Sequence, residues 1–127
     1  MYHKKRDEMI TEDYVSFGVA KLLKEKGFNE PCHKAYNYEG CLCTGFTYGP
    51  YAPTLQMAVK WLREKHNLAI ATYLTGDGWR SGVSRIKFNG EGFIVDIIDG
   101  IDDGNIPNRG TYEEACEEAI KYCLNLI

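Results

Sequence analysis

Long apolar runs, a dense set of cysteines and an excess of basic residues are all missing from this 127-residue chain. No apolar stretch approaches the ~18 residues of a membrane-spanning helix, and none follows the basic start as in a secretory signal. The 5 cysteines are too few for a disulfide scaffold, and an odd number is typical of free thiols in a reducing compartment. We therefore expect a cytoplasmic protein with no membrane partner.

The chain also lacks a large excess of either positive or negative residues. The 15 Lys and Arg residues against 18 Asp and Glu residues give a net charge of −3, which disfavours a dedicated nucleic-acid binder. A hydrophobic content of 44% is sufficient for one core, so disorder is excluded for most of the chain. We expect residues 1–9 to be a polar, disordered extension and residues 10–127 to form a single domain.

Capping residues and hydrophobic spacing predict three helices. The first is expected to begin at Thr11 as N-cap and to stop at Gly27. The second is expected over about 53–66, with Asn67 as its stop. The third begins with the capping box 111–114. Its apolar stripe, expected to be buried, consists of Tyr112, Ala115, Cys116, Ala119, Ile120, Cys123 and Ile127.

Five strands are expected between these helices, two before the second helix and three after it. Residues 32–47 are predicted to form a hairpin that turns near 37–40, and three further strands are expected at roughly 68–75, 83–88 and 93–98. Glycine-rich turns are predicted at 76–82 and 89–92. Alternation over 83–88 places Val83, Arg85 and Lys87 on one face and Ser84, Ile86 and Phe88 on the other, which predicts one solvated face with the charged residues and one packed face with the apolar ones. The order α-β-β-α-β-β-β-α predicts an α+β domain in which an antiparallel sheet packs against three helices.

Cysteine and histidine lie close together in the predicted hairpin, as they do in zinc sites. A two- or four-residue turn places Cys32, Cys41 and Cys43 on one face, whereas a three-residue loop groups His33 with Cys41 and Cys43. Neither register gives four converging ligands, so small buried thiols are the favoured interpretation.

Cysteine catalysis is disfavoured for a separate reason. Cys116 and Cys123 lie on the apolar stripe of the last helix, where a thiol is inert. His66 stands at a helix end, where it can simply interact with the helix dipole.

The acidic stretch contains Asp96, Asp99, Asp102 and Asp103. It fails the EF-hand template, because the bidentate Glu is missing from its last position. A looser divalent-cation site is an alternative to a solvated loop. With a turn at 89–92, Asp96 is also expected to share a sheet face with Arg85 as an exposed cross-strand pair.

Trp79 and Arg80 are expected at the tip of the 76–82 turn. These residue types are enriched at binding hot spots, so an exposed tip indicates a contact site. A tryptophan folded back over the sheet edge is the equal alternative. The segment 36–51 is rich in tyrosine and phenylalanine, and ordinary packing is favoured there over a contact surface.

Residues 52–127, in the order α-β-β-β-α, resemble the double-stranded-RNA-binding domain. That family grips phosphates with lysines at the start of its last helix, where this chain has the sequence TYEEA at 111–115. The strands and that helix start also resemble the arm-binding domains of phage integrases. The sheet of those domains carries more basic residues than Arg80, Arg85 and Lys87.

Three segments resemble, in sequence, a group of small uncharacterised proteins encoded in prophages and mobile elements of gut bacteria. They are AKLLKEKGF (20–28), YAPTLQMAVKWLRE (51–64) and TYEEA (111–115). The resemblance spans nearly all of residues 10–127. It implies a cytoplasmic accessory protein and assigns no catalytic residue.

No catalytic pair, metal set or phosphate loop has the spacing that its chemistry requires, so no cofactor is expected. The sequence favours a non-enzymatic protein-interaction module, and homodimers are possible. Its expected binding residues are Trp79, Arg80, Arg85 and Lys87. One alternative is a nucleic-acid-binding module that adds Lys60 and Arg63. A second is a small metal-dependent hydrolase that uses Asp99, Asp102 or Asp103.

Overall fold

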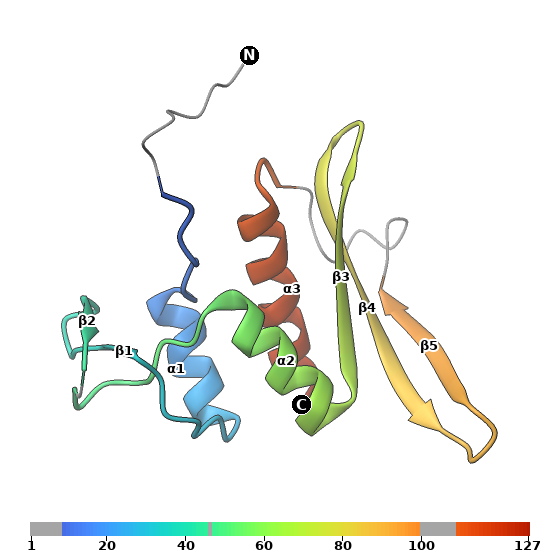
Figure 1. Cartoon of the computed structure of the whole chain (residues 1–127), viewed down its shortest axis with the longest axis horizontal. Helices are drawn as coiled ribbons and strands as arrows, with labels where there is room; N and C mark the ends of the chain where they lie inside the picture. The colour runs from blue at the N-terminus through green and yellow to red at the C-terminus, as the bar shows by residue number, and fades with distance from the viewer. Residues whose placement is uncertain (1–8, 46, 100–108) are drawn as a thin grey trace.

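The computed structural model describes residues 9–45, 47–99 and 109–127. The elements, in order, are α1 (Phe17–Glu25), β1 (Lys34–Tyr36), β2 (Leu42–Thr44), α2 (Leu55–His66), β3 (Leu68–Thr75), β4 (Gly78–Phe88), β5 (Phe93–Asp99) and α3 (Tyr112–Leu126). They confirm the predicted order and the α+β class (Figure 1). The strands form two antiparallel sheets, β1–β2 and β3–β4–β5.

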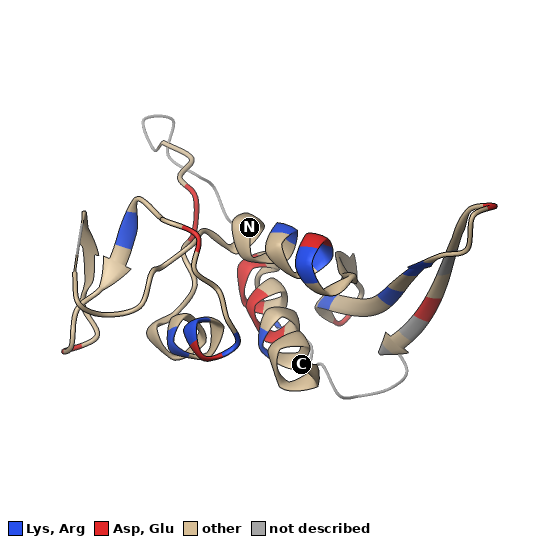
Figure 2. Cartoon of the chain, turned by 90° about the horizontal axis from the view of Figure 1, so that it is seen from below, with Lys and Arg blue, Asp and Glu red and all other residues tan. Residues whose placement is uncertain are grey.

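Helix α3 occupies the centre of the molecule and packs against α1, α2, β3 and β4. The helices lie on one side of the three-stranded sheet, and the β1–β2 hairpin lies beyond α1 at the far end (Figures 1 and 2). The predicted apolar stripe of α3 is confirmed as the centre of the core, and Tyr112 and Ile127 are partly buried at its ends. Leu68 and Val83, both fully buried, complete the core from the sheet.

The predicted start of the first helix at Thr11 is wrong. Helix α1 begins at Phe17, and Ser16 is its N-cap, with Oγ accepting a hydrogen bond from the Val19 N–H at 3.3 Å. The preceding residues are extended instead, because Val15 is fully buried and its N–H donates to the Pro53 carbonyl at 3.0 Å. The local capping pattern assigned the residues from Thr11 to Val15 to the helix. In the structure Val15 pairs instead with Pro53, just before α2.

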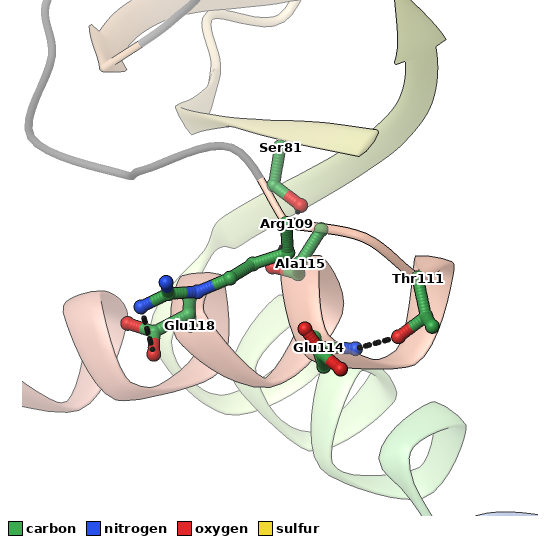
Figure 3. A network of polar contacts seen from close by, with 6 residues as sticks. All are labelled: Ser81, Arg109, Thr111, Glu114, Ala115 and Glu118. Carbon is green, nitrogen blue, oxygen red and sulfur yellow. Dashed lines mark hydrogen bonds and ion pairs between the residues drawn. The ribbon is translucent and has the colours of Figure 1, made fainter. Parts of the chain in front are cut away.

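Helix ends follow the sequence more closely. Gly27, with φ at +99°, follows the last turn of α1, and Asn67, with φ at +56°, ends α2, as predicted. The start of α2 differs slightly from the prediction, because Thr54 is the N-cap and Pro53 precedes the helix. At the start of α3, the Thr111 Oγ1 accepts a hydrogen bond from the Glu114 N–H at 3.1 Å (Figure 3).

The predicted turn over 76–82 is mostly strand. Thr75 pairs with Gly78, so only Gly76 and Asp77 connect β3 to β4. The start of β4 gains a partner from a distant part of the chain, because Trp79 and Arg109 exchange two backbone hydrogen bonds of 2.8 and 2.9 Å. A local turn pattern carries no information about such pairing.

The predicted hairpin is confirmed, with Lys34 opposite Thr44 and Tyr36 opposite Leu42. Tyr36 is buried, and its hydroxyl donates to the Val15 carbonyl at 2.6 Å. Tyr38 and Tyr48 are 79% and 74% exposed and stack at 6.2 Å. Packing therefore accounts for only part of this aromatic segment.

Gly49 approaches the hairpin backbone very closely, since a Cβ placed on it would lie 1.9 Å from the Tyr36 carbonyl oxygen. We expect Gly49→Ala to lower the free energy of unfolding by about 1–3 kcal/mol in urea denaturation, because the loop must move away. Gly18→Ala is the matched control, since a Cβ there meets nothing within 4 Å. It should stabilise α1 by roughly 0.5–1 kcal/mol. Equal effects of the two substitutions would contradict the close approach.

Candidate functional site

The three-stranded sheet has two faces of different character, which follow from the alternation along β4. Ser81 and Val83 are 2% and 0% exposed and face the helices, and the Ser81 Oγ donates to the Ala115 carbonyl at 2.9 Å (Figure 3). We call this side the inner face. Successive residues point to opposite sides of a strand, so Ser84, Ile86 and Phe88 lie on the other side, the outer face.

The outer face carries large apolar side chains near the turn that connects β4 to β5. Phe88 lies opposite Phe93, and Ile86 lies opposite Val95. Phe88 and Phe93 are 70% and 75% exposed, and their rings meet edge to face at 5.6 Å. Val95 is 57% exposed. These four residues, Ile86, Phe88, Phe93 and Val95, are called the apolar patch below.

The inner face of the same hairpin carries an ion pair. The Lys87 ammonium lies 3.2 Å from the Asp96 carboxylate, and both side chains are more than half exposed. Asp96 lies opposite Arg85 in the register, as expected, but its ion pair is with Lys87 on the diagonal. Among the side chains that the structure describes in this hairpin, the polarity is therefore reversed, because the charged pair lies on the helix side and the exposed apolar residues face away from the core.

The reversed polarity occurs where helix α3 no longer covers the sheet. The helix packs along β3 and β4 from Tyr112, which contacts Trp79, to Cys123 and Leu124, which are fully buried in the core. Beyond Leu126 the helix ends, and the β4–β5 hairpin continues away from the helices (Figures 1 and 2). At Lys87 and Asp96 the inner face thus meets solvent.

A shallow hollow of about 580 Å³ extends the apolar patch across the sheet. Its floor is formed by Ala69, Ser84 and Ile86, with Phe93 and Val95 along one side. Helix α2 contributes Arg63 to its rim, and Asn67 follows from the helix end. One cation therefore borders an almost entirely apolar surface.

The four residues expected to bind do not form one surface. Trp79 lies within β4 and not at a turn tip, and its ring packs edge to face on Tyr112 at 5.6 Å. Arg80, the next residue of the strand, lies on the outer face. Arg85 and Lys87 lie on the inner face, where Lys87 is paired with Asp96.

The cysteines are free thiols in two environments. Cys116 and Cys123 are buried, and burial raises their pKa to about 11 and about 12. In the hairpin, Cys41 and Cys43 share a sheet face with His33, as the three-residue loop would place them. Even so, no three His, Cys, Asp or Glu side chains converge within the described parts of the chain. Asp102 and Asp103 and the side chain of Asp99 lie outside the described residues.

No motif in the sequence marks Phe88, Phe93, Val95 and Arg63 as one site. A signal for the aromatic pair was present, because the two phenylalanines flank the predicted 89–92 turn symmetrically. The prediction that Phe88 belongs to the packed face of 83–88 is wrong, because Phe88 is 70% exposed and Val83, on the opposite face, is fully buried. The exposed side of the sheet becomes evident only once α3 is seen to pack on Ser81 and Val83.

No protein-family model, curated protein or solved structure matches the chain. None of the described helices has the length and apolar character required to cross a membrane.

Trp79 is expected to be a structural residue. Trp79→Ala removes its packing on Tyr112 and should lower the free energy of unfolding by about 2–3 kcal/mol. Leu74, which lies opposite Trp79 on β3 and is 65% exposed, provides the control. Leu74→Ala should change stability by no more than ~0.5 kcal/mol. A loss at Trp79 no larger than at Leu74 would show that the indole does not hold α3 to the sheet.

The buried thiols also predict how stability depends on pH. Their pKa values are raised in the folded state, so the unfolded chain loses these protons first and stability falls as pH rises above about 9. Each thiol should contribute a loss of about 1.4 kcal/mol between pH 8 and pH 10. Urea denaturation of the wild type and of Cys123→Ala measures this, and the variant should show the smaller pH dependence. An unchanged pH dependence in the variant would refute the assignment.

Proposed function

We propose that this protein is a non-enzymatic protein-interaction module that contacts its partner through the apolar patch on the outer face of the sheet. The observation that carries the proposal is the reversed polarity of the β4–β5 hairpin. Its apolar residues Phe88 and Phe93 face away from the core, while Lys87 and Asp96 occupy the helix side. A hairpin that served only this chain's own core would have the opposite pattern.

The size of the patch supports the same conclusion. With the exposed fractions of Phe88, Phe93 and Val95, the patch offers roughly 350–400 Å² of apolar side-chain surface. Contiguous apolar surface of this size is commonly functional on a soluble protein. Burying it would contribute about 9–10 kcal/mol before the cost of association.

The titratable groups favour binding over catalysis. The described groups with a shifted pKa are Cys32, Tyr36, Cys116 and Cys123, and burial is the main cause at each. None of them lines the hollow on the outer face. The alternative of a metal-dependent hydrolase depends on Asp99, Asp102 and Asp103, and the described residues add no support for it.

A nucleic-acid partner has less support than a protein. Aromatic rings on an open antiparallel sheet can stack on single-stranded bases, but a basic groove must also follow the phosphates. The basic residues of β4 are split between two faces, with Arg80 on the outer one and Arg85 and Lys87 on the inner one. We therefore favour a protein partner, and the capture experiment below also detects bound nucleic acid.

The proposal predicts that the apolar patch is required for partner capture. Phe88→Ser/Phe93→Ser should reduce recovery of a specific protein from nuclease-treated host lysate by at least about tenfold, because both anchors are lost. The matched control is Tyr38→Ser/Tyr48→Ser, which removes the other exposed pair of aromatic rings. It should capture the partner as the wild type does, and circular dichroism should show all three proteins folded.

Three results would refute the proposal. They are recovery of the partner by the phenylalanine variant at the wild-type level, recovery of nucleic acid alone from untreated lysate, and capture of nothing by the wild type.

A further inference from the structure

The hollow on the outer face restricts what kind of protein segment can occupy it. Its centre lies over β4, because the lining residues come from all three strands, Ala69 from β3, Ile86 from β4 and Val95 from β5. The backbone of β4 is paired with β3 on one side and with β5 on the other. No main-chain hydrogen bonds are therefore available to a ligand at the centre of this face.

An occupant must consequently satisfy its own backbone groups. An α-helix does so internally, whereas an added strand would have to pair along the β5 edge, away from Ala69 and Ile86. A helix is about 10 Å wide, which matches two strands spaced about 4.8 Å apart together with their side chains. A helix laid on a sheet face is also the usual way in which such a face is covered.

The charge of Arg63 at the rim of the hollow indicates which charge the side of a bound helix should carry. Arg63 is an exposed cation in the last turn of α2, and the described residues give it no ion-pair partner. The other polar groups of the hollow, Asn67 and Ser84, are neutral. The described side chains of the outer face include no Asp or Glu. A carboxylate beside the apolar residues of a partner would complement Arg63.

A second copy of this chain fits the surface less well. A second outer face would bring no described carboxylate to Arg63, whereas a partner of different sequence can supply one.

From these observations, and resting on the function proposed above, we infer that the partner contributes an amphipathic α-helix with carboxylates along one flank. Its apolar side lies on Ile86, Phe88, Phe93 and Val95, and an acidic side chain pairs with Arg63.

A displayed library of helical peptides of about 18 residues tests this inference on the full chain. Its apolar positions, spaced i, i+3, i+4 and i+7, vary among Leu, Ile, Met and Phe, and its flanking positions vary among Glu, Lys and Gln. Selection on the wild type should enrich Glu over Lys at one flank, and Phe88→Ser/Phe93→Ser should retain none of the enriched peptides. Arg63→Glu should reverse the preference to Lys and weaken an enriched acidic peptide by about tenfold or more.

Lys60→Glu is the matched control for the charge reversal. It changes a basic residue of the same helix that does not line the hollow, and it should leave the preference for Glu unchanged. Equal use of Glu and Lys on the wild type, or the same reversal with Lys60→Glu, would overturn the assigned role of Arg63.

Further outcomes separate this inference from the proposed function. If no helix is enriched while lysate capture still depends on Phe88 and Phe93, the helical ligand is wrong and the interaction module stands. If no helix is enriched and lysate capture does not depend on Phe88 and Phe93, the helical ligand and the interaction module are both wrong. A dimer that Phe88→Ser/Phe93→Ser dissociates in sedimentation would identify a second copy as the occupant. Binding of a fluorescent oligothymidylate that the same variant abolishes would identify nucleic acid.

Discussion

The close packing of α3 on the inner face of the sheet is the constraint on which the rest of this structure depends. Ala115 and Ala119 are fully buried, and their small side chains let the helix approach β4. The approach is close enough for the Ser81 hydroxyl to reach the Ala115 carbonyl at 2.9 Å (Figure 3). Ser81 also bonds to the Thr72 hydroxyl, so its buried polar group is satisfied on both sides. This arrangement decides which face of β3 and β4 is buried.

The same helix organises the N-terminal half. Glu117 of α3 accepts a hydrogen bond of 2.8 Å from the Ser16 N–H, the residue that caps α1. At the other end of α1, the Lys26 ammonium donates to the Ile127 carbonyl oxygen at 2.6 Å. Both ends of α1 are thus attached to α3, which explains why burial of Val15 before α1 overrides the local signal at Thr11.

The length of α3 relative to β4 creates the surface to which we assign function. The helices cover β4 from Trp79 to Val83, and the strand continues to Phe88. Past the helix, the inner face no longer borders a core, so a solvated ion pair between Lys87 and Asp96 is stable there. The described residues do not cover the phenylalanines on the other face, and the partner that we propose would cover them.

The sequence by itself determined the order of the elements, the ends of α1 and α2, the cap of α3 and its buried stripe. These depend on local chemistry, such as the left-handed φ of Asn67 or the hydroxyl of Thr111, which nearby residues specify. Only the tertiary structure decided the start of α1, the extension of β4 to Gly78 and the outward direction of Phe88. Each of these depends on a partner distant in the chain, Pro53 for Val15, Arg109 for Trp79 and Ala115 for Ser81. Alternation along a strand predicts two faces, but the face that is buried is set by the helix that packs against it.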